Sequence, residues 1–153
     1  MSKGAVSELR KRAALLPTAK RRDMCWEIGW FQVSMLVKEP GEAPINPYLL
    51  VCIDTASRFV LGNLLLKDTP RPMDFLSLLV ASMEAALPGE AGSVLPRSVQ
   101  LNDSGALKLL RSELRGLGID FQIVEELQFV REFARISERE FFSRRSGYAG
   151  HRN

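Results

Sequence analysis

The sequence contains few of the residues that form disulfides, zinc sites and histidine-dependent active sites. Two cysteines, Cys25 and Cys52, and one histidine, His151, occur in 153 residues. The cysteines do not form a CxxC pair and the histidine lies in a polar C-terminal stretch, so we expect neither a disulfide framework nor a zinc site. Without a histidine in the core, serine–histidine and cysteine–histidine catalysis are excluded. We therefore expect reduced, mostly buried thiols in a cytoplasmic protein.

Long apolar runs are also missing. The longest uninterrupted run, residues 48–53, is far shorter than the roughly 20 residues that span a bilayer. The basic N-terminus is not followed by the apolar segment of a secretory signal, so we expect no membrane partner. What the sequence does have is 46% hydrophobic residues, which suits one compact domain with its own core.

The two ends of the chain carry net positive charge, whereas the interior is acidic. The formal net charge is +3, but residues 1–22 hold seven basic residues against one acidic residue, the last eleven residues add three arginines, and the interior carries −6. Basic ends can bind a phosphate backbone, and they can equally serve as solubilising termini. The candidate nucleic-acid contacts are Arg10, Lys11, Arg12, Lys20, Arg21, Arg22, Arg144 and Arg145.

Apolar runs separated by chain breakers predict an α/β domain. The expected strands are residues 26–37, 48–53, 59–66, 98–102 and 121–124; the expected helices start after Pro72, at 107–117 and at 129–145. The resulting order, β-β-β-α-β-α-β-α, predicts a mixed five-stranded sheet flanked by helices. We divide the chain into a basic segment at 1–22 that is partly flexible or forms a short helix at 6–16, one domain at 23–145 and a basic, flexible tail at 146–153.

Four short stretches carry a resemblance to a known family. They are Trp26-Glu27-Ile28-Gly29, residues 48–62 with the turn from Asp54 to Ser57-Arg58, Asp103-Ser104-Gly105, and Glu138-Arg139-Glu140. With the strand order, these stretches resemble the catalytic core of retroviral-type integrases and DDE transposases, in the ribonuclease H-like superfamily, over residues 24–142. The sequence is also similar to uncharacterised bacterial domains of the same strand order. The resemblance implies a ribonuclease H-like fold.

The resemblance also implies phosphoryl transfer by two divalent ions, Mg²⁺ or Mn²⁺, held between three carboxylates. The position aligned with the family's first Asp is Gly29, which has no side chain. Glu27 lies two residues away on the same face of the strand, and Asp54 is a second substitute, although its surroundings have the composition of a hairpin turn. Asp103 matches the second Asp, with capping of the following helix as the alternative.

Two glutamates compete for the place of the third carboxylate. Glu138, followed by Arg139, matches the family's Glu-Arg motif. Helical geometry at about 100° per residue, however, directs Glu138 away from the apolar stripe that contains Phe133 and Ile136. The same geometry places Glu140 on that stripe, where it could reach the sheet or extend into solvent. The ligands of an active metal site would therefore include Asp103 and Glu140.

Two hypotheses follow from these residues. Because Gly29 supplies no carboxylate, we predict a catalytically inactive binding or interaction module without a cofactor, which could bind nucleic acid through its basic termini; a homodimer or another protein partner stays open. The alternative is a metal-dependent nuclease or a transposase- or integrase-like phosphoryl transferase. Its rearranged site would consist of Glu27 or Asp54, Asp103 and Glu140.

Overall fold

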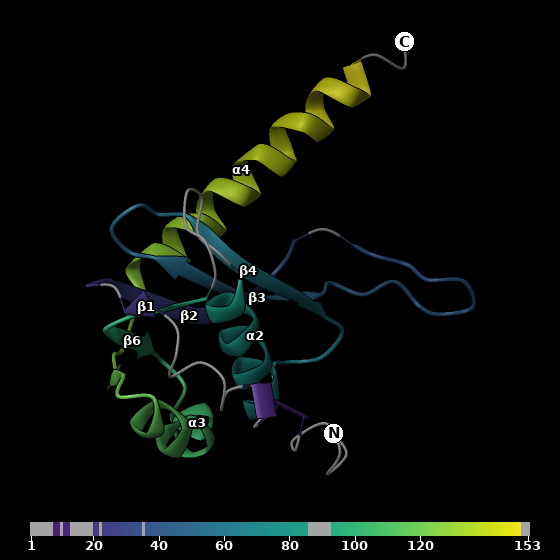
Figure 1. Ribbon diagram of the computed structural model, residues 1–153. Coiled ribbons are helices and arrows are strands. Elements are labelled where there is room, and N and C mark those ends of the chain that lie inside the picture. The colour runs from purple at the N-terminus through teal and green to yellow at the C-terminus, as the bar shows by residue number, and fades with distance from the viewer. Residues whose placement is uncertain are drawn as a thin grey trace.

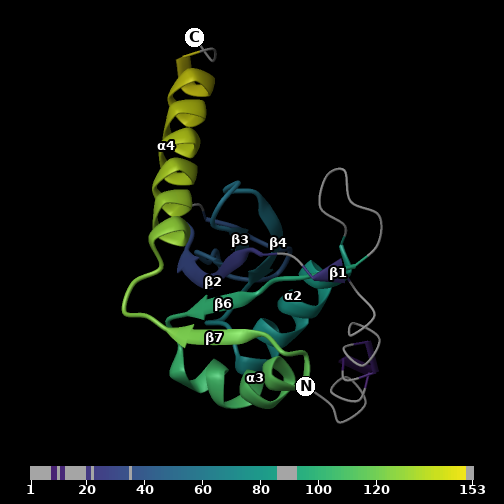
Figure 2. The ribbon, with the colours of Figure 1, turned by 60° about the vertical axis from the view of Figure 1, so that its left-hand side comes forward.

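A mixed sheet of five strands forms the centre of the protein. The computed structural model describes residues 8–9, 11–12, 20–21, 23–34, 36–85 and 93–150, and for residues 20–21 and 141–150 it describes the backbone alone. The strand order in the sheet is β4-β3-β2-β6-β7 (Figures 1 and 2). Its strands are β2 (Cys25–Gln32), β3 (Tyr48–Asp54), β4 (Val60–Leu66), β6 (Ser98–Leu101) and β7 (Asp120–Ile123).

Helices cover both faces of this sheet. α2 (Pro72–Glu84) and α3 (Ser104–Gly116) lie on one face, and α4 (Gln128–Gly150) begins on the other and extends away from the domain (Figures 1 and 2). The element order and the mixed sheet confirm the predicted fold class, an α/β domain of ribonuclease H-like architecture. No helix within the described ranges is long and apolar enough to cross a membrane.

The direction of the strands follows from their connections. β2, β3 and β4 are consecutive in the sequence and pair antiparallel, whereas β6 and β7 follow helical crossovers and run parallel to β2. β6 pairs with β2 only over residues 25–28. The remaining residues of β2 therefore have β3 as their one neighbouring strand in the described part of the chain. Outside this sheet, β1 (Lys20–Arg21) and β5 (Val94–Leu95) form a separate parallel pair.

Side chains of β2 and β3 alternate between two hydrophobic cores. The larger core lies under α2 and α3 and includes the fully buried Trp26 and Ile28. Because strand residues alternate, the next residues of the same strands face α4. The smaller core on that side consists of Val51, Ile53, Leu127 and Val130.

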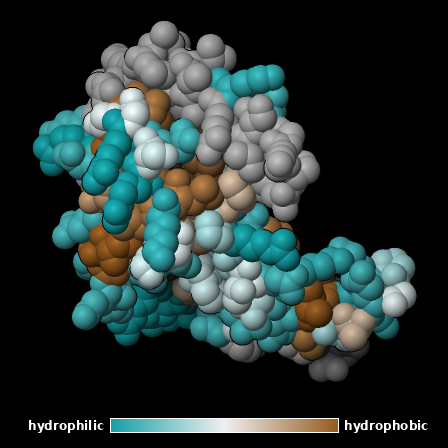
Figure 3. Space-filling model, turned by 90° about the horizontal axis from the view of Figure 1, so that it is seen from below, coloured by the Kyte–Doolittle hydropathy of each residue, from teal (hydrophilic) through white to brown (hydrophobic). Residues whose placement is uncertain are grey.

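Some element boundaries differ from those predicted. β2 ends at Gln32 rather than near residue 37. Residues 33–34 and 36–47 then form a projecting arm, in which Val37 and Ile45 form an isolated antiparallel pair. The arm stands out from the domain in Figure 1, and Figure 3 shows hydrophobic atoms among hydrophilic ones along it. α4 continues to Gly150, beyond the predicted end at 145. The predicted helix at 6–16 is described only at residues 8–9 and 11–12, which are helical.

Candidate functional site

An apolar side chain covers Gly29, the position that the resemblance aligns with a first carboxylate. A Cβ atom built on Gly29 would lie 2.3 Å from Cδ1 of Leu127. Leu127 immediately precedes α4, is only 3% exposed and packs in the smaller core. The polar atom nearest to that Cβ position is Oδ1 of Asn102, at 3.7 Å. Leu127 was not foreseen from the sequence, and it fills the space where a side chain at position 29 would begin.

Glu27 is buried and holds the N-terminus of α4. Its side-chain Oε1 accepts the backbone N–H groups of Phe129 (2.9 Å) and Val130 (3.0 Å), and the residue is 2% exposed. Leu127, the residue before the helix, has no polar side chain with which to satisfy these N–H groups, so a residue from β2 caps α4 instead. Burial raises the pKa of the Glu27 carboxyl, and the two backbone hydrogen bonds act in the opposite direction.

Asp103 caps α3. Its Oδ1 accepts the backbone N–H of Ala106 at 3.0 Å, which is the capping alternative considered for this residue. Val99 and Leu101 of β6 face the core under α2 and α3, so Asn102 rather than Asp103 follows the alternation toward the α4 side. The side chain next to Gly29 at the end of β6 is thus Asn102, an amide.

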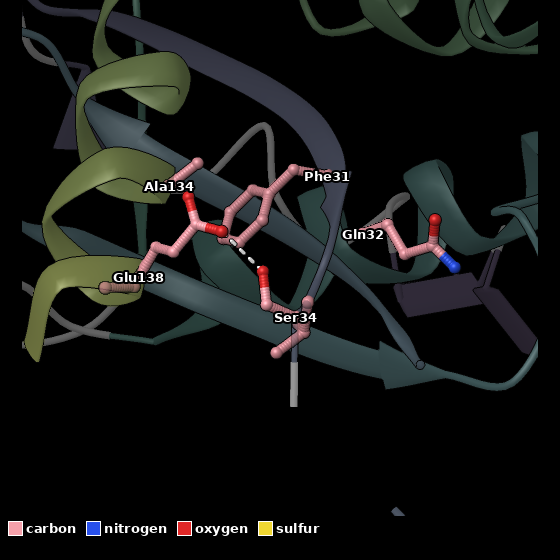
Figure 4. A pocket seen from close by; sticks show the side chains of 7 residues that line it. Phe31, Gln32, Ser34, Ala134 and Glu138 are labelled. Carbon is pink, nitrogen blue, oxygen red and sulfur yellow. Dashed lines mark hydrogen bonds between the residues drawn. The ribbon is translucent and has the colours of Figure 1, made fainter. Parts of the chain in front are cut away.

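Of the two candidate glutamates of α4, Glu138 lies differently from the prediction and Glu140 is exposed, which is one of its two predicted positions. Glu138 does not face away from the sheet: its Oε1 accepts the hydroxyl of Ser34, just after β2, at 2.5 Å (Figure 4). Ile136, expected on the buried stripe, is 46% exposed, and Glu140 is exposed as well. The helix contacts the sheet through Val130, Ala134 and Glu138, four residues apart, as well as through Phe129 and Phe133 of the predicted stripe.

Asp54 organises the turn between β3 and β4. Its Oδ2 accepts the backbone N–H of Ser57 at 3.0 Å and the Ser57 hydroxyl at 2.6 Å. Arg58 completes the turn with a φ of 62°, in the left-handed region. Asp54 pairs with Trp26 across the ladder, so its side chain lies on the α2 side of the sheet, opposite to that of Glu27.

The carboxylates named for a rearranged metal site are therefore distributed over both faces of the sheet. Asp103 caps a helix on one face, and Glu140 belongs to the helix on the other. Within the described residues, no three His, Cys, Asp or Glu side chains are grouped closely enough to hold a metal ion. Because Glu27 is engaged with α4 and Leu127 covers Gly29, the residues present do not fit a two-metal site on β2.

Some of the basic residues predicted to contact nucleic acid lie within the described part of the chain. Arg12 is bound to Glu84 of α2, its Nε lying 3.1 Å from each carboxylate oxygen, and Lys11 is exposed. Lys20 and Arg21 form β1 and Arg144 and Arg145 belong to α4, but only their backbone is described. Arg10 and Arg22 lie outside the described residues.

These contacts define an α/β domain of ribonuclease H-like architecture in which Leu127 packs on Gly29 of the central strand. Residues 12–136 match the family described as "Domain of unknown function (DUF6930)", and the chain belongs to this family. No curated protein matches the sequence.

Solved structures of Mos1 assemblies are similar to this chain. They are the Mos1 strand transfer complex (12% identity, TM-score 0.38), a pre-cleavage Mos1 transpososome (12%, 0.36) and the Mos1 mariner paired end complex with Mn (12%, 0.37). The matches cover 79%, 97% and 79% of this chain, which spans 42%, 50% and 43% of the respective Mos1 chains. At these TM-scores the similarity carries no argument about function.

Proposed function

We propose that this domain is a catalytically inactive ribonuclease H-like module that binds another macromolecule. The observation that carries the proposal is the contact between Leu127 and Gly29. Two-metal phosphoryl transfer needs oxygen ligands at fixed positions, and an aliphatic side chain at the central position neither binds a metal ion nor leaves room for one.

The remaining carboxylates have structural tasks that support the same proposal. Glu27 caps α4, Asp103 caps α3 and Asp54 holds a turn, so each carboxylate oxygen concerned is engaged with backbone N–H groups. Local capping accounts for the presence of these acidic residues without any catalytic role.

Metal binding and cleavage assays test the proposal against the alternative of an active nuclease or phosphoryl transferase. The full chain is titrated with Mg²⁺ and Mn²⁺ in a calorimeter and incubated with labelled DNA and RNA. We expect no saturable metal binding and no cleavage, with the same result for Asp103→Asn. Metal-dependent cleavage that is lost in Asp103→Asn but kept in the exposed-carboxylate control Asp68→Asn would overturn the proposal.

Nucleic acid is the partner class that the charged termini support. The excess of basic residues at both ends predicts binding that weakens steeply as salt increases. Arg12 contributes less than its charge implies, because Glu84 already neutralises it. A fluorescent DNA duplex titrated at low salt tests this prediction: binding should weaken in the Arg144→Gln/Arg145→Gln variant, and equal affinity of both proteins would contradict it.

A further inference from the structure

The second half of β2 has an unpaired edge. β6 pairs with residues 25–28 only, while β2 continues to Gln32. The Val33 N–H donates to the Pro47 carbonyl at 2.8 Å, so the alternation of the antiparallel ladder directs the N–H and C=O groups of Trp30 and Gln32 away from β3. In the described part of the chain no strand pairs with these groups. We call residues 30–32 the β2 edge; such an edge is a template for another strand.

A cavity lies beside the β2 edge, between the end of the strand and α4. Its volume is ≈ 270 Å³. In Figure 4, Phe31 points toward α4 and Gln32 points the opposite way, as expected for neighbouring residues of a strand. The residues that line the cavity are Phe31, Gln32, Val33, Ser34, Ala134, Ser137 and Glu138.

The cavity combines an apolar wall with one carboxylate. Phe31 supplies aromatic surface and contacts Phe133 edge to face, with ring centroids 6.0 Å apart. The exposed Glu138 accepts the hydroxyl of Ser34, and no Lys or Arg of the described residues forms an ion pair with it. The site therefore offers main-chain hydrogen bonds, an apolar contact and a negative charge within a short distance of each other.

We propose that the β2 edge and this cavity bind an extended peptide segment of a partner protein, which adds a strand beside β2. The segment places an apolar side chain against Phe31 and a Lys or Arg beside Glu138. This inference rests on the proposed binding role and assigns a protein partner to the β2 edge, apart from the basic termini proposed to bind nucleic acid.

The spacing within the peptide follows from strand geometry. A residue opposite Phe31 points to the α4 side, and so does the residue two positions along, about 6.6 Å away and opposite Val33. That second position lies next to Ser34, whose hydroxyl contacts Glu138. An apolar residue and a cation separated by one residue match the site. Nucleic acid does not match it, because the Glu138 carboxylate repels phosphate and an unpaired strand edge is satisfied by another backbone.

Two synthetic peptides test the proposal with the full-length protein. They are acetyl-Thr-Thr-Leu-Thr-Lys-Thr-Thr-amide and the same peptide with Leu and Lys exchanged, since the edge admits either strand direction. We expect saturable binding of one of them by fluorescence anisotropy. Replacing its Lys by Glu should weaken binding about two- to fivefold, the range of an exposed ion pair. The Glu138→Lys variant should reverse this preference, whereas the matched control Glu125→Lys, at an exposed loop position, should not.

A separate experiment tests the contribution of main-chain hydrogen bonds to peptide binding. Gln32→Pro removes an N–H from the β2 edge without touching the ladder to β3, and N-methylation of the peptide removes the corresponding partner. Each change should weaken binding about fivefold for one hydrogen bond, and the N-methylated peptide gives this result without altering the protein. No saturable binding at millimolar peptide, or binding indifferent to the charge reversal, would overturn the inference.

Two further outcomes distinguish peptide binding at the β2 edge from dimerisation of the chain and from the proposed inactive function. Concentration-dependent dimerisation that Gln32→Pro abolishes would assign the edge to a second copy of the chain and reject the peptide. Absence of peptide binding together with absence of cleavage rejects this inference alone, whereas metal-dependent cleavage rejects the proposed function whatever the peptide does.

Discussion

Replacing Gly29 by alanine tests whether Leu127 occupies the space above the central strand. The new methyl carbon would lie 2.3 Å from Leu127 Cδ1, whereas carbon atoms in contact are about 3.5 to 4.0 Å apart. Leu127 must therefore move by more than about 1 Å within a core where it is only 3% exposed. The substitution inserts volume at a site that is already filled.

The expected change in the free energy of unfolding of Gly29→Ala follows from two opposing effects. Overpacking a core costs about 1 to 3 kcal/mol, and replacing glycine by alanine in a strand returns about 0.5 to 1 kcal/mol. We expect Gly29→Ala to lower the free energy of unfolding by up to about 2.5 kcal/mol. Leu127→Ala alone should lower it by about 2 to 5 kcal/mol, because it leaves a cavity. In the Leu127→Ala background the methyl at position 29 meets no leucine, so the same glycine substitution should become neutral or stabilising.

The four proteins of this double-mutant cycle at positions 29 and 127 are compared by urea unfolding, which gives the free energy of unfolding of each. Tryptophan fluorescence follows the transition, since the buried Trp26 lies on the same strand as Gly29. The control is Gly116→Ala, where an added Cβ meets nothing within 4 Å and stability should rise slightly. A coupling energy between positions 29 and 127 below about 0.5 kcal/mol, the usual limit of additivity, would refute the reasoning.

Three other measurements follow from the contacts described. Burial raises the pKa of Glu27 in the folded state, so its contribution to stability is present below its unfolded pKa and is lost as pH rises through the folded one. In urea titrations, Glu27→Gln, which keeps the acceptor without the charge, should therefore gain stability relative to the native chain as pH rises above the unfolded pKa of glutamate, about 4.3. Glu27→Ala should lose about 1 to 3 kcal/mol per unsatisfied N–H. Parallel pH profiles of the native and Gln proteins would contradict this prediction. Asp103→Ala should cost about 1 kcal/mol in the same assay and Asp103→Asn much less, because asparagine also caps helices; equal losses would show that the cap is unimportant. Burial raises the pKa of Cys52 to about 12, so this thiol should react with an alkylating agent at pH 8 only on unfolding, and rapid modification of the native protein, read by mass spectrometry, would contradict its burial.

The fold could be predicted from the sequence because its signals are local. Apolar runs and breakers located the strands and helices, and their order alone implied a mixed sheet. The strand at 48–53 is apolar on both faces and is in fact buried between two cores. The end of β2 was placed five residues too far, since Val37 pairs outside the sheet with Ile45.

The site could be predicted only in part, because its decisive contacts join distant segments. The sequence showed that Gly29 supplies no carboxylate. It did not show the contact with Leu127, because that residue lies almost a hundred positions later and no pattern near Gly29 predicts it. One signal was available: residues 125–128 read Glu-Glu-Leu-Gln, with no Ser, Thr, Asp or Asn to cap the helix that follows. A helix without a local cap needs an acceptor from elsewhere in the fold, and Glu27 supplies it.

The contact between Leu127 and Gly29 and the β2 edge both lie beyond the end of β6. Because β6 ends at Leu101, opposite Ile28, the strand β2 loses its parallel neighbour at Gly29. Leu127 and the start of α4 fill the space above Gly29 from one face of the sheet, and Glu27 fixes α4 in that position. The helix covers the face of the sheet but cannot satisfy the edge, whose backbone groups point along the sheet plane toward the missing strand. The arrangement that underlies the proposed loss of metal chemistry also leaves the main-chain groups of Trp30 and Gln32 without a pairing strand in the described part of the chain.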